Sequence, residues 1–236
     1  MSNEMKRLTA PRSWPIKRKA HLWITKPSPG AHALEDSVPV TVVVRDLLKI
    51  CNTAAEVKTI LSNRDMLVDG KIVNDSRKGI GLMDVISFPK ANSHYRMVVN
   101  VRGKLTLVAI PEEKSSWKLC RIDNKTIVPG GKTQLNLHDG RNILVEKDEY
   151  KTGDVLKIEV PTQKILGAYK MEQGSMALIT SGSNVGRAEV IDEIIVRRLS
   201  SDNIVNFKNG SSTTRGNVFV IGNKVPEIEL PEEAAI

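Results

Sequence analysis

The chain has 236 residues, of which 40% are hydrophobic and 26% charged, and its 35 Lys and Arg against 27 Asp and Glu give a net charge of +8. This length is sufficient for two or three modules with their own cores. No apolar run approaches the roughly 20 residues that span a bilayer, which argues against a membrane protein. The first 30 residues lack the apolar segment of a signal peptide, so we expect a cytoplasmic protein.

Metal and cofactor chemistry has little support in the sequence. Cys51 and Cys120 show no CxxC spacing, and the four histidines show no HxxxH arrangement. Two isolated cysteines suit a reducing compartment and cannot form a four-cysteine zinc site. We therefore expect no metal site and no cofactor.

The positive charge is confined to the first half of the chain. Residues 1–110 carry 18 basic and 9 acidic side chains, a net +9, whereas residues 111–236 carry 17 and 18, a net −1. An excess of this kind on one region favours a polyanionic partner such as nucleic acid.

Residues 1–40 form a basic extension, here called the arm, with Lys and Arg interspersed with prolines. This composition predicts an extended segment that is poorly ordered on its own. Trp14 and Trp23 lie among the charges, and aromatic rings beside Lys and Arg suit stacking on bases next to phosphate contacts. In the alternative, the two tryptophans cover the next domain and the charges remain solvated.

Two helices and a hairpin are predicted in residues 41–92. Val40, Val44, Leu47, Leu48 and Cys51 lie on one face of a helix. Thr53 followed by Glu56 has the spacing of a capping box, which predicts the start of a second helix. Asp69-Gly70 in the segment LVDGKIV (67–73) is a two-residue turn between short strands, and GLMDVISF (81–88) adds another strand. This order of elements resembles the small RNA-binding module of bacterial ribosomal protein S4, tyrosyl-tRNA synthetases and several pseudouridine synthases.

The rest of the chain is predicted to be β-structure. Short apolar runs separated by turn signals indicate a central small β-domain at 93–172, including a hairpin at Arg102-Gly103. In residues 173–226, the segment MALITSGSNVGRAEVIDEI (176–194) reads as strand, Gly-rich loop and strand. It resembles the KOW motif of ribosomal and elongation proteins, which implies an SH3-type barrel, although Glu189 stands where the motif has glycine. Residues 227–236 form an acidic tail, expected to be exposed or disordered.

Taken together, the ordered motifs resemble the archaeal and eukaryotic ribosomal protein family S4e over nearly the full length. The fold class is thus an α+β, multi-module protein with arm, S4-type module, central β-domain and KOW-like barrel. Membership implies a structural constituent of the small ribosomal subunit that binds rRNA in the 5′ domain. The implied partners are small-subunit rRNA and neighbouring ribosomal proteins, with no membrane and no independent homo-oligomer.

Candidate RNA contacts follow from charge, exposed position and motif. On the arm, cations for phosphates and rings for stacking are Lys6, Arg7, Arg12, Trp14, Lys17, Arg18, Lys19 and His21. On the module, the candidates are Arg45, Lys49, Lys58, Arg64, Lys71, Arg77 and Lys78. In the Gly-rich loop, which can bring backbone amides to a phosphate, they are Gly182, Asn184 and Arg187.

Two other functions are compatible with parts of the sequence. Arg121-Ile122-Asp123, with Thr126 three residues on, resembles the catalytic segment of pseudouridine synthases, and the resemblance would make Asp123 the catalytic residue. Pro129-Gly130-Gly131 interrupts the apolar run expected after it, so we predict no catalytic residue. A translation or transcription factor that binds the ribosome transiently is the third possibility.

Overall fold

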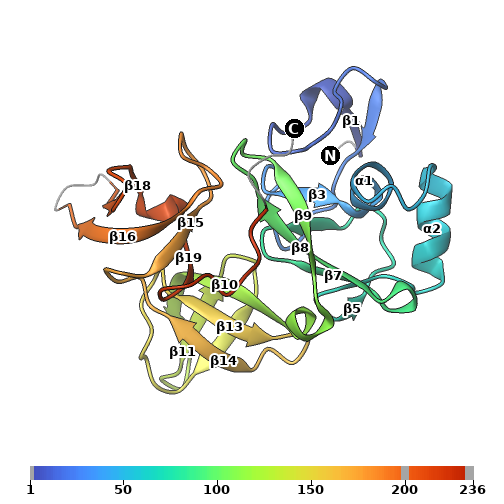
Figure 1. Ribbon diagram of the computed structural model, residues 1–236. Coiled ribbons are helices and arrows are strands. Elements are labelled where there is room, and N and C mark those ends of the chain that lie inside the picture. Colours follow the sequence, from blue (N-terminus) through green and yellow to red (C-terminus); the bar gives the residue numbers. More distant parts are fainter. Residues whose placement is uncertain (1–2, 198–201, 232–236) are drawn as a thin grey trace. The chain divides into compact units, whose positions relative to one another are not determined.

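The computed structural model describes residues 3–197 and 202–231 and shows a mostly β protein with few helices (Figure 1). The chain divides into two compact units. Unit 1 comprises Met1–Val98 and Lys104–Lys118, and unit 2 comprises Val99–Gly103 and Leu119–Ile236. No helix within the described residues is long and apolar enough to cross a membrane.

The arm is folded within the whole chain, and its poor order in isolation stays a prediction. Strands β1 (Glu4–Lys6) and β2 (Trp23–Thr25) pair antiparallel and bury Met5 and Ile24 on one face. A 3₁₀ turn at Arg7–Thr9 follows β1. The indole of Trp14 is 1% exposed, so the arm contributes its own side chains to the core of unit 1.

The two predicted helices are present, but the first is shorter and more deeply buried than its periodicity indicated. It consists of α1 (Val40–Val42) and a π-helical segment at Val43–Leu47. Because Val42 and Val43 are fully buried as well as Val40 and Val44, the helix is covered on more than one face. Helix α2 (Ala54–Ser62) begins with the predicted capping box, in which the Glu56 amide donates to Thr53 Oγ1 at 3.3 Å.

The predicted hairpin lies inside a five-stranded sheet of unit 1. Asp69 and Gly70 have φ values of 51° and 70°, as a two-residue turn of this type requires. The sheet has the order β5-β4-β7-β8-β9, and a separate pair joins β3 to β6. The five-stranded sheet extends beyond residue 92, where the sequence placed the end of the module. Its strands β8 and β9, on either side of Arg102-Gly103, belong to the same sheet. The strands of these two sheets are β3 (Ser37–Pro39), β4 (Leu67–Val68), β5 (Lys71–Ile72), β6 (Gly79–Gly81), β7 (Val85–Phe88), β8 (Ser93–Val99) and β9 (Leu105–Ile110).

Unit 2 contains a central sheet with the order β12-β11-β10-β13-β14. One face is covered by a cluster that includes Cys120, Ile122, Leu135 and Leu156, and alternating apolar residues on neighbouring strands produce this core. In unit 1, short 3₁₀ turns at Pro89–Ala91 and Glu112–Ser116 precede β8 and β10. The strands are β10 (Trp117–Ile127), β11 (Thr133–Leu137), β12 (Asn142–Val145), β13 (Val155–Glu159) and β14 (Ile165–Tyr169).

A second five-stranded sheet of unit 2 has the order β18-β17-β16-β15-β19. Its strands are β15 (Met176–Ile179), β16 (Ala188–Ile195), β17 (Ile204–Phe207), β18 (Ser212–Thr214) and β19 (Val218–Gly222), with a 3₁₀ turn at Arg215–Asn217. The first residues of the expected tail are ordered against this unit. Ile228 is 3% exposed, and Glu227 pairs with Lys157 at 2.8 Å. Residues 232–236 of that tail lie outside the described residues.

Candidate nucleic-acid interface

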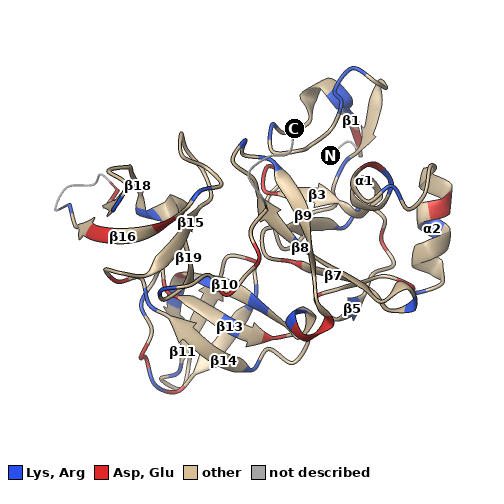
Figure 2. Cartoon of the chain, in the orientation of Figure 1, with Lys and Arg blue, Asp and Glu red and all other residues tan. Residues whose placement is uncertain are grey.

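The charge asymmetry of the sequence coincides with the division into units. Unit 1 carries 19 basic and 11 acidic side chains, a net +8, and unit 2 carries 16 of each. Figure 2 shows Lys and Arg recurring along the arm and the surrounding parts of unit 1. The whole excess of positive charge therefore lies on unit 1, and an excess of this kind favours a polyanionic partner.

The cations of the arm divide into exposed residues and residues used within the arm. Lys6, Arg12, Lys17 and Lys19 are exposed. Arg7 is 5% exposed, and its Nε donates to the Lys17 carbonyl at 2.6 Å. These four exposed side chains can reach phosphates, whereas Arg7 stabilises the arm itself.

Arg18 also acts within the arm. Its guanidinium donates to the carbonyl oxygens of Ala10 and Pro11 at 2.6 and 2.8 Å. These carbonyls belong to a proline-containing segment with no sheet partner, and the arginine adds hydrogen bonds there to the one that the Pro11 carbonyl accepts from the Trp14 amide at 3.3 Å. Arg7 is thus buried and Arg18 half-buried in contacts within the arm, and phosphate contact by these two residues stays a prediction.

The predicted stacking residues have opposite environments. His21 is exposed on the arm, but Trp14 is 1% exposed and cannot offer its ring to a base. The burial of Trp14 agrees with the alternative in which the tryptophans cover the next domain. Trp23 is 51% exposed, so the accessible indole of the arm is that one.

The cations on and after the two helices and in the Asp69–Gly70 hairpin are mostly exposed. Lys49, Lys58, Arg64 and Lys71 are exposed, and Lys49 and Arg64 have φ values of 55° and 60° that turn the chain after each helix. Arg45 is half-buried and bonds both carboxylate oxygens of Asp46, at 2.9 and 3.0 Å.

Two further module cations, Arg77 and Lys78, are half-buried. Arg77 joins the module to the arm, because its guanidinium donates to the Lys26 carbonyl at 3.3 Å and to Asn3 Oδ1 at 3.1 Å. The module thus presents exposed cations on its surface. Arg77 fixes the arm to the module.

The turn that presents Lys71 is held by buried ionic contacts. Asp69 Oδ1 accepts the amide hydrogen of Val85 at 3.0 Å, and Asp69 Oδ2 accepts from Lys118 Nζ at 2.8 Å. Lys118 is fully buried and also donates to Asp84 Oδ1 at 2.8 Å. Lys118 therefore connects the Asp69–Gly70 turn to Asp84, the residue immediately before β7.

Asp84 connects the same cluster to the arm. Its Oδ2 lies 3.0 Å from His32 Nε2 and accepts from the Gly81 amide at 2.9 Å. Burial alone raises the pKa of the Asp84 carboxyl, but Lys118 and His32, through charge and hydrogen bonds, hold that pKa well below its usual range. Gly81 is required here, since a Cβ at this position would lie 2.3 Å from the His32 ring.

The Gly-rich loop connects the antiparallel strands β15 and β16, so the predicted strand–loop–strand order is present. Gly182 and Arg187 are exposed and Asn184 is half-buried. Glu189, which replaces the motif glycine, is 6% exposed and accepts from Ser211 Oγ at 2.5 Å. The departure from the motif thus has a local role, because the carboxylate fixes the segment between β17 and β18.

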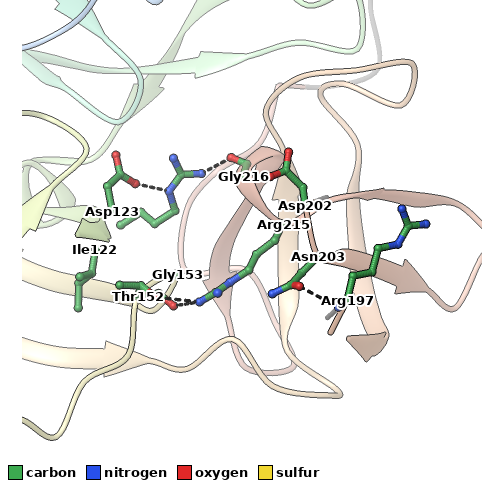
Figure 3. A pocket seen from close by; sticks show the side chains of 10 residues that line it. Ile122, Asp123, Thr152, Gly153, Arg197, Asp202, Asn203, Arg215 and Gly216 are labelled. Atoms are coloured by element: carbon green, nitrogen blue, oxygen red, sulfur yellow. Dashed lines mark hydrogen bonds and ion pairs between the residues drawn. The ribbon is translucent and has the colours of Figure 1, made fainter. Parts of the chain in front are cut away.

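The segment that resembles a synthase active site lies in a cleft of unit 2 with a volume of 480 Å³ (Figure 3). Arg121 Nε donates to Asp123 Oδ1 at 2.7 Å, and Arg121 Nη1 donates to the Gly216 carbonyl at 2.6 Å. Arg215 bonds Thr152 on the other side of the cleft, through the backbone carbonyl and through Oγ1. These arginines connect the two sheets of unit 2, and Asp123 is neutralised by an adjacent guanidinium.

Three possible metal ligands meet in unit 2 although their sequence spacing gave no sign of it. The ligand atoms of Cys120, His138 and Asp139 lie within 4.8 Å of one another. All three already have protein partners: Cys120 Sγ donates to Asp139 Oδ2 at 3.5 Å, His138 Nδ1 accepts from the Arg121 amide at 3.2 Å, and Asp139 Oδ2 pairs with Arg141 at 3.1 Å. The cation of Arg141 supplies the positive charge that the carboxylate requires, so the contacts account for the cluster without an ion.

Comparison with known proteins decides the family. A family model described as Ribosomal family S4e matches residues 91–165, and the RS4NT (NUC023) domain matches residues 1–35. Small ribosomal subunit protein eS4 of Methanosphaera stadtmanae is 45% identical over 96% of this chain and 95% of its own length. The chain belongs to the S4e family of ribosomal proteins. The family is structural and non-enzymatic, which excludes the synthase alternative.

Other S4e proteins match over a similar extent. Small ribosomal subunit protein eS4 of Methanothermobacter thermautotrophicus is 42% identical over 96% of this chain and 95% of its own length. The crystal structure of the 30S ribosomal protein S4e from Thermoplasma acidophilum is 38% identical, with a TM-score of 0.71 over 80% of this chain and 96% of that chain. The S4e resemblance stated from the motifs is confirmed.

The sequence did not predict the role of Lys118 and His32, which contact Asp69 and Asp84 of the S4-type module from elsewhere in the chain. Lys118 gave no signal, because one lysine in the strand segment WKLC resembles any solvent-facing strand residue. Its only hint is that Trp117 and Leu119 flank it in a strand buried on both sides. His32 was not among the predicted site residues, and its partner Asp84 lies 52 residues away.

Proposed function

We propose that this S4e protein is a structural constituent of the small ribosomal subunit that binds rRNA, in its 5′ domain, mainly through unit 1. The observation that carries this proposal is the net charge of +8 on unit 1 against zero on unit 2, in a chain whose relatives are small-subunit proteins. Exposed lysines and arginines neutralise phosphates and release counterions, which gives strong, salt-dependent binding.

The domain assignment forms part of the proposal. The arm and residues 41–92 act together as an S4-type RNA-binding module, with the exposed cations Lys6, Arg12, Lys17, Lys19, Lys49, Lys58, Arg64, Lys71 and the half-buried Arg45, Arg77 and Lys78 around it. The sheet of β15–β19 serves as a KOW-like barrel whose loop offers Gly182, Asn184 and Arg187. A-form RNA hides its base edges in a deep groove, so a rigid module of this kind reads shape and 2′-hydroxyls more than sequence.

The direct test is the binding of the purified chain to a transcript of the 5′ domain of archaeal small-subunit rRNA at several salt concentrations. Each phosphate contact contributes about 0.7–0.9 to the slope of log affinity against log salt. A combined Lys17→Ala and Lys19→Ala variant should reduce that slope by about 1.4–1.8. A matched variant in unit 2, Lys147→Ala with Lys151→Ala, removes the same charge from exposed positions and should leave the slope unchanged.

Fractionation distinguishes a resident protein from a transient factor. We expect the chain to comigrate with the small subunit after a high-salt wash, because a folded arm and module provide many simultaneous phosphate contacts. Loss of the chain from the subunit at moderate salt would instead indicate a factor that binds transiently.

A further inference from the structure

We infer that Trp23 forms the stacking wall of a site for a single unpaired nucleotide of RNA, on the outer face of the β1–β2 hairpin. This inference rests on the proposed function and names a ligand and a residue for it. Trp14 and Trp23 both lie among the basic residues of the arm, although only Trp14 and His21 are among the predicted site residues. The structure buries Trp14 and leaves 51% of Trp23 exposed.

The register of the hairpin places a cation directly beside this indole. Lys6 pairs with Trp23, and Glu4 pairs with Thr25. Directly paired residues of an antiparallel ladder lie on the same face with Cβ atoms about 4.5–5.5 Å apart. The opposite face carries Met5 and Ile24, both less than 9% exposed, which fix the hairpin on unit 1. The outer face therefore presents a rigidly mounted aromatic ring next to an exposed ammonium group.

A groove of 400 Å³ begins at this face. Its lining residues are Asn3, Glu4, Trp23, Ile24, Thr25 and Arg45. Its volume lies within the usual range of small-ligand sites, about 300–1,000 Å³. The walls thus combine an indole, the polar side chains of Asn3 and Thr25, the carboxylate of Glu4 and the guanidinium of Arg45.

The chemistry of these walls favours a nucleotide over an apolar protein segment. A base can stack on the indole, its edge can hydrogen-bond polar groups such as Asn3 and Thr25, and its phosphate can contact Lys6. The groove lies on the unit that carries the whole excess of positive charge. An unpaired nucleotide is required, since bases inside a duplex stack on one another and expose no face to the indole.

The test compares Trp23→Ala with Trp23→Phe in binding to the 5′-domain rRNA transcript. Stacking of a base on an aromatic side chain corresponds to about a 5- to 160-fold change in affinity on removal of the ring. We expect a loss in this range for Trp23→Ala and substantial retention for Trp23→Phe. Because the indole carries no charge, the salt slope should remain that of the unaltered chain, whereas Lys6→Ala should lower it by about 0.7–0.9.

A neighbouring residue provides the matched control. Leu22 precedes β2 and is 63% exposed, so Leu22→Ala removes a similar exposed apolar group without a ring and should leave affinity unchanged. Quenching of tryptophan fluorescence by the RNA gives a second measurement. Trp14 and Trp117 are at most 8% exposed, so most quenching should disappear in Trp23→Phe.

The outcomes separate this inference from the function on which it depends. If the unaltered chain binds the transcript with the expected salt slope but Trp23→Ala binds equally well, the stacking site is wrong and the proposed function stands. If the unaltered chain shows no salt-dependent binding, the proposed function itself fails. Unchanged RNA affinity together with loss of Trp23→Ala from salt-washed subunits would show that the indole contacts a protein, which overturns the nucleotide site.

Discussion

Lys118 and Asp69 are 49 residues apart in the chain, yet Lys118 Nζ donates to Asp69 Oδ2 at 2.8 Å inside unit 1. The same ammonium lies 2.8 Å from Asp84, and both carboxylates are about as buried as the lysine. Two acids around one lysine leave a net negative charge, which His32 beside Asp84 can neutralise when protonated. One buried network thus joins the arm, the Asp69–Gly70 turn and the strand β7.

Removing the lysine should strongly destabilise unit 1. Lys118→Met leaves two buried carboxylates without their cation, and breaking a buried ion pair in this way costs about 3–5 kcal/mol. Urea denaturation measures the loss. Lys90→Met is the matched control, because Lys90 pairs with Asp65 at 2.7 Å but its side chain is 73% exposed, and an exposed pair contributes about 0–1 kcal/mol.

A triple variant tests whether charge, and not packing, causes that loss. Lys118→Met combined with Asp69→Asn and Asp84→Asn contains no uncompensated charge. It should recover part of the stability lost in the single variant. Equal instability of the single and triple variants would contradict the electrostatic explanation.

The stability of the protein should fall at acid pH because of Asp84. Lys118 and His32 hold the pKa of this carboxyl well below its usual range despite its burial. A group with a lowered pKa in the folded state contributes its stability above the unfolded value of about 3.9 and loses it as pH falls below that value. Denaturation midpoints measured between about pH 5 and pH 2 should therefore decline more steeply for the unaltered protein than for Asp84→Asn. Asp65→Asn, which changes a carboxyl in a surface pair, should keep the steep decline.

Trp14 should contribute to stability and Trp23 should not. Trp14→Ala removes a side chain that is 1% exposed, and truncation of a buried aromatic residue costs about 3–5 kcal/mol. Trp23→Ala removes a half-exposed ring and should change the free energy of unfolding by less than about 1 kcal/mol. Chemical denaturation of both variants checks this contrast, and similar losses for the two would contradict a folded arm.

Gly186 should tolerate no side chain, for a reason beyond its backbone angle. Its φ is +77°, and a Cβ there would lie 2.2 Å from the carbonyl oxygen of Asn100, which also belongs to unit 2. Gly131 has a similar φ of +74° but no atom within 4 Å of the added Cβ. Gly131→Ala should therefore cost only the left-handed strain of about 1–2 kcal/mol, and Gly186→Ala clearly more. Equal costs in thermal denaturation would show that the contact with Asn100 yields easily.

The local elements were largely determined by the sequence itself. The Thr53–Glu56 cap, the Asp69–Gly70 turn and the strands around the Gly-rich loop follow from hydrogen bonds and backbone angles between residues a few positions apart. Charge asymmetry and motif order also sufficed to indicate the S4e family. Caps, turns and short strands depend on residues that are close together in the chain, so the sequence pattern is sufficient to predict them.

The tertiary structure decided which candidate residues are available to a ligand. Arg7, Trp14 and Arg18 looked equivalent to other arm residues, but folding buries Arg7 and Trp14 and engages the half-buried Arg18 in hydrogen bonds within the arm. The partners of Lys118 lie 34 and 49 residues away, a distance at which no periodicity operates. Burial and long-range ion pairs depend on which distant segments the fold brings into contact. For this reason the sequence alone did not show that Trp23, and not Trp14, is the exposed tryptophan of the arm.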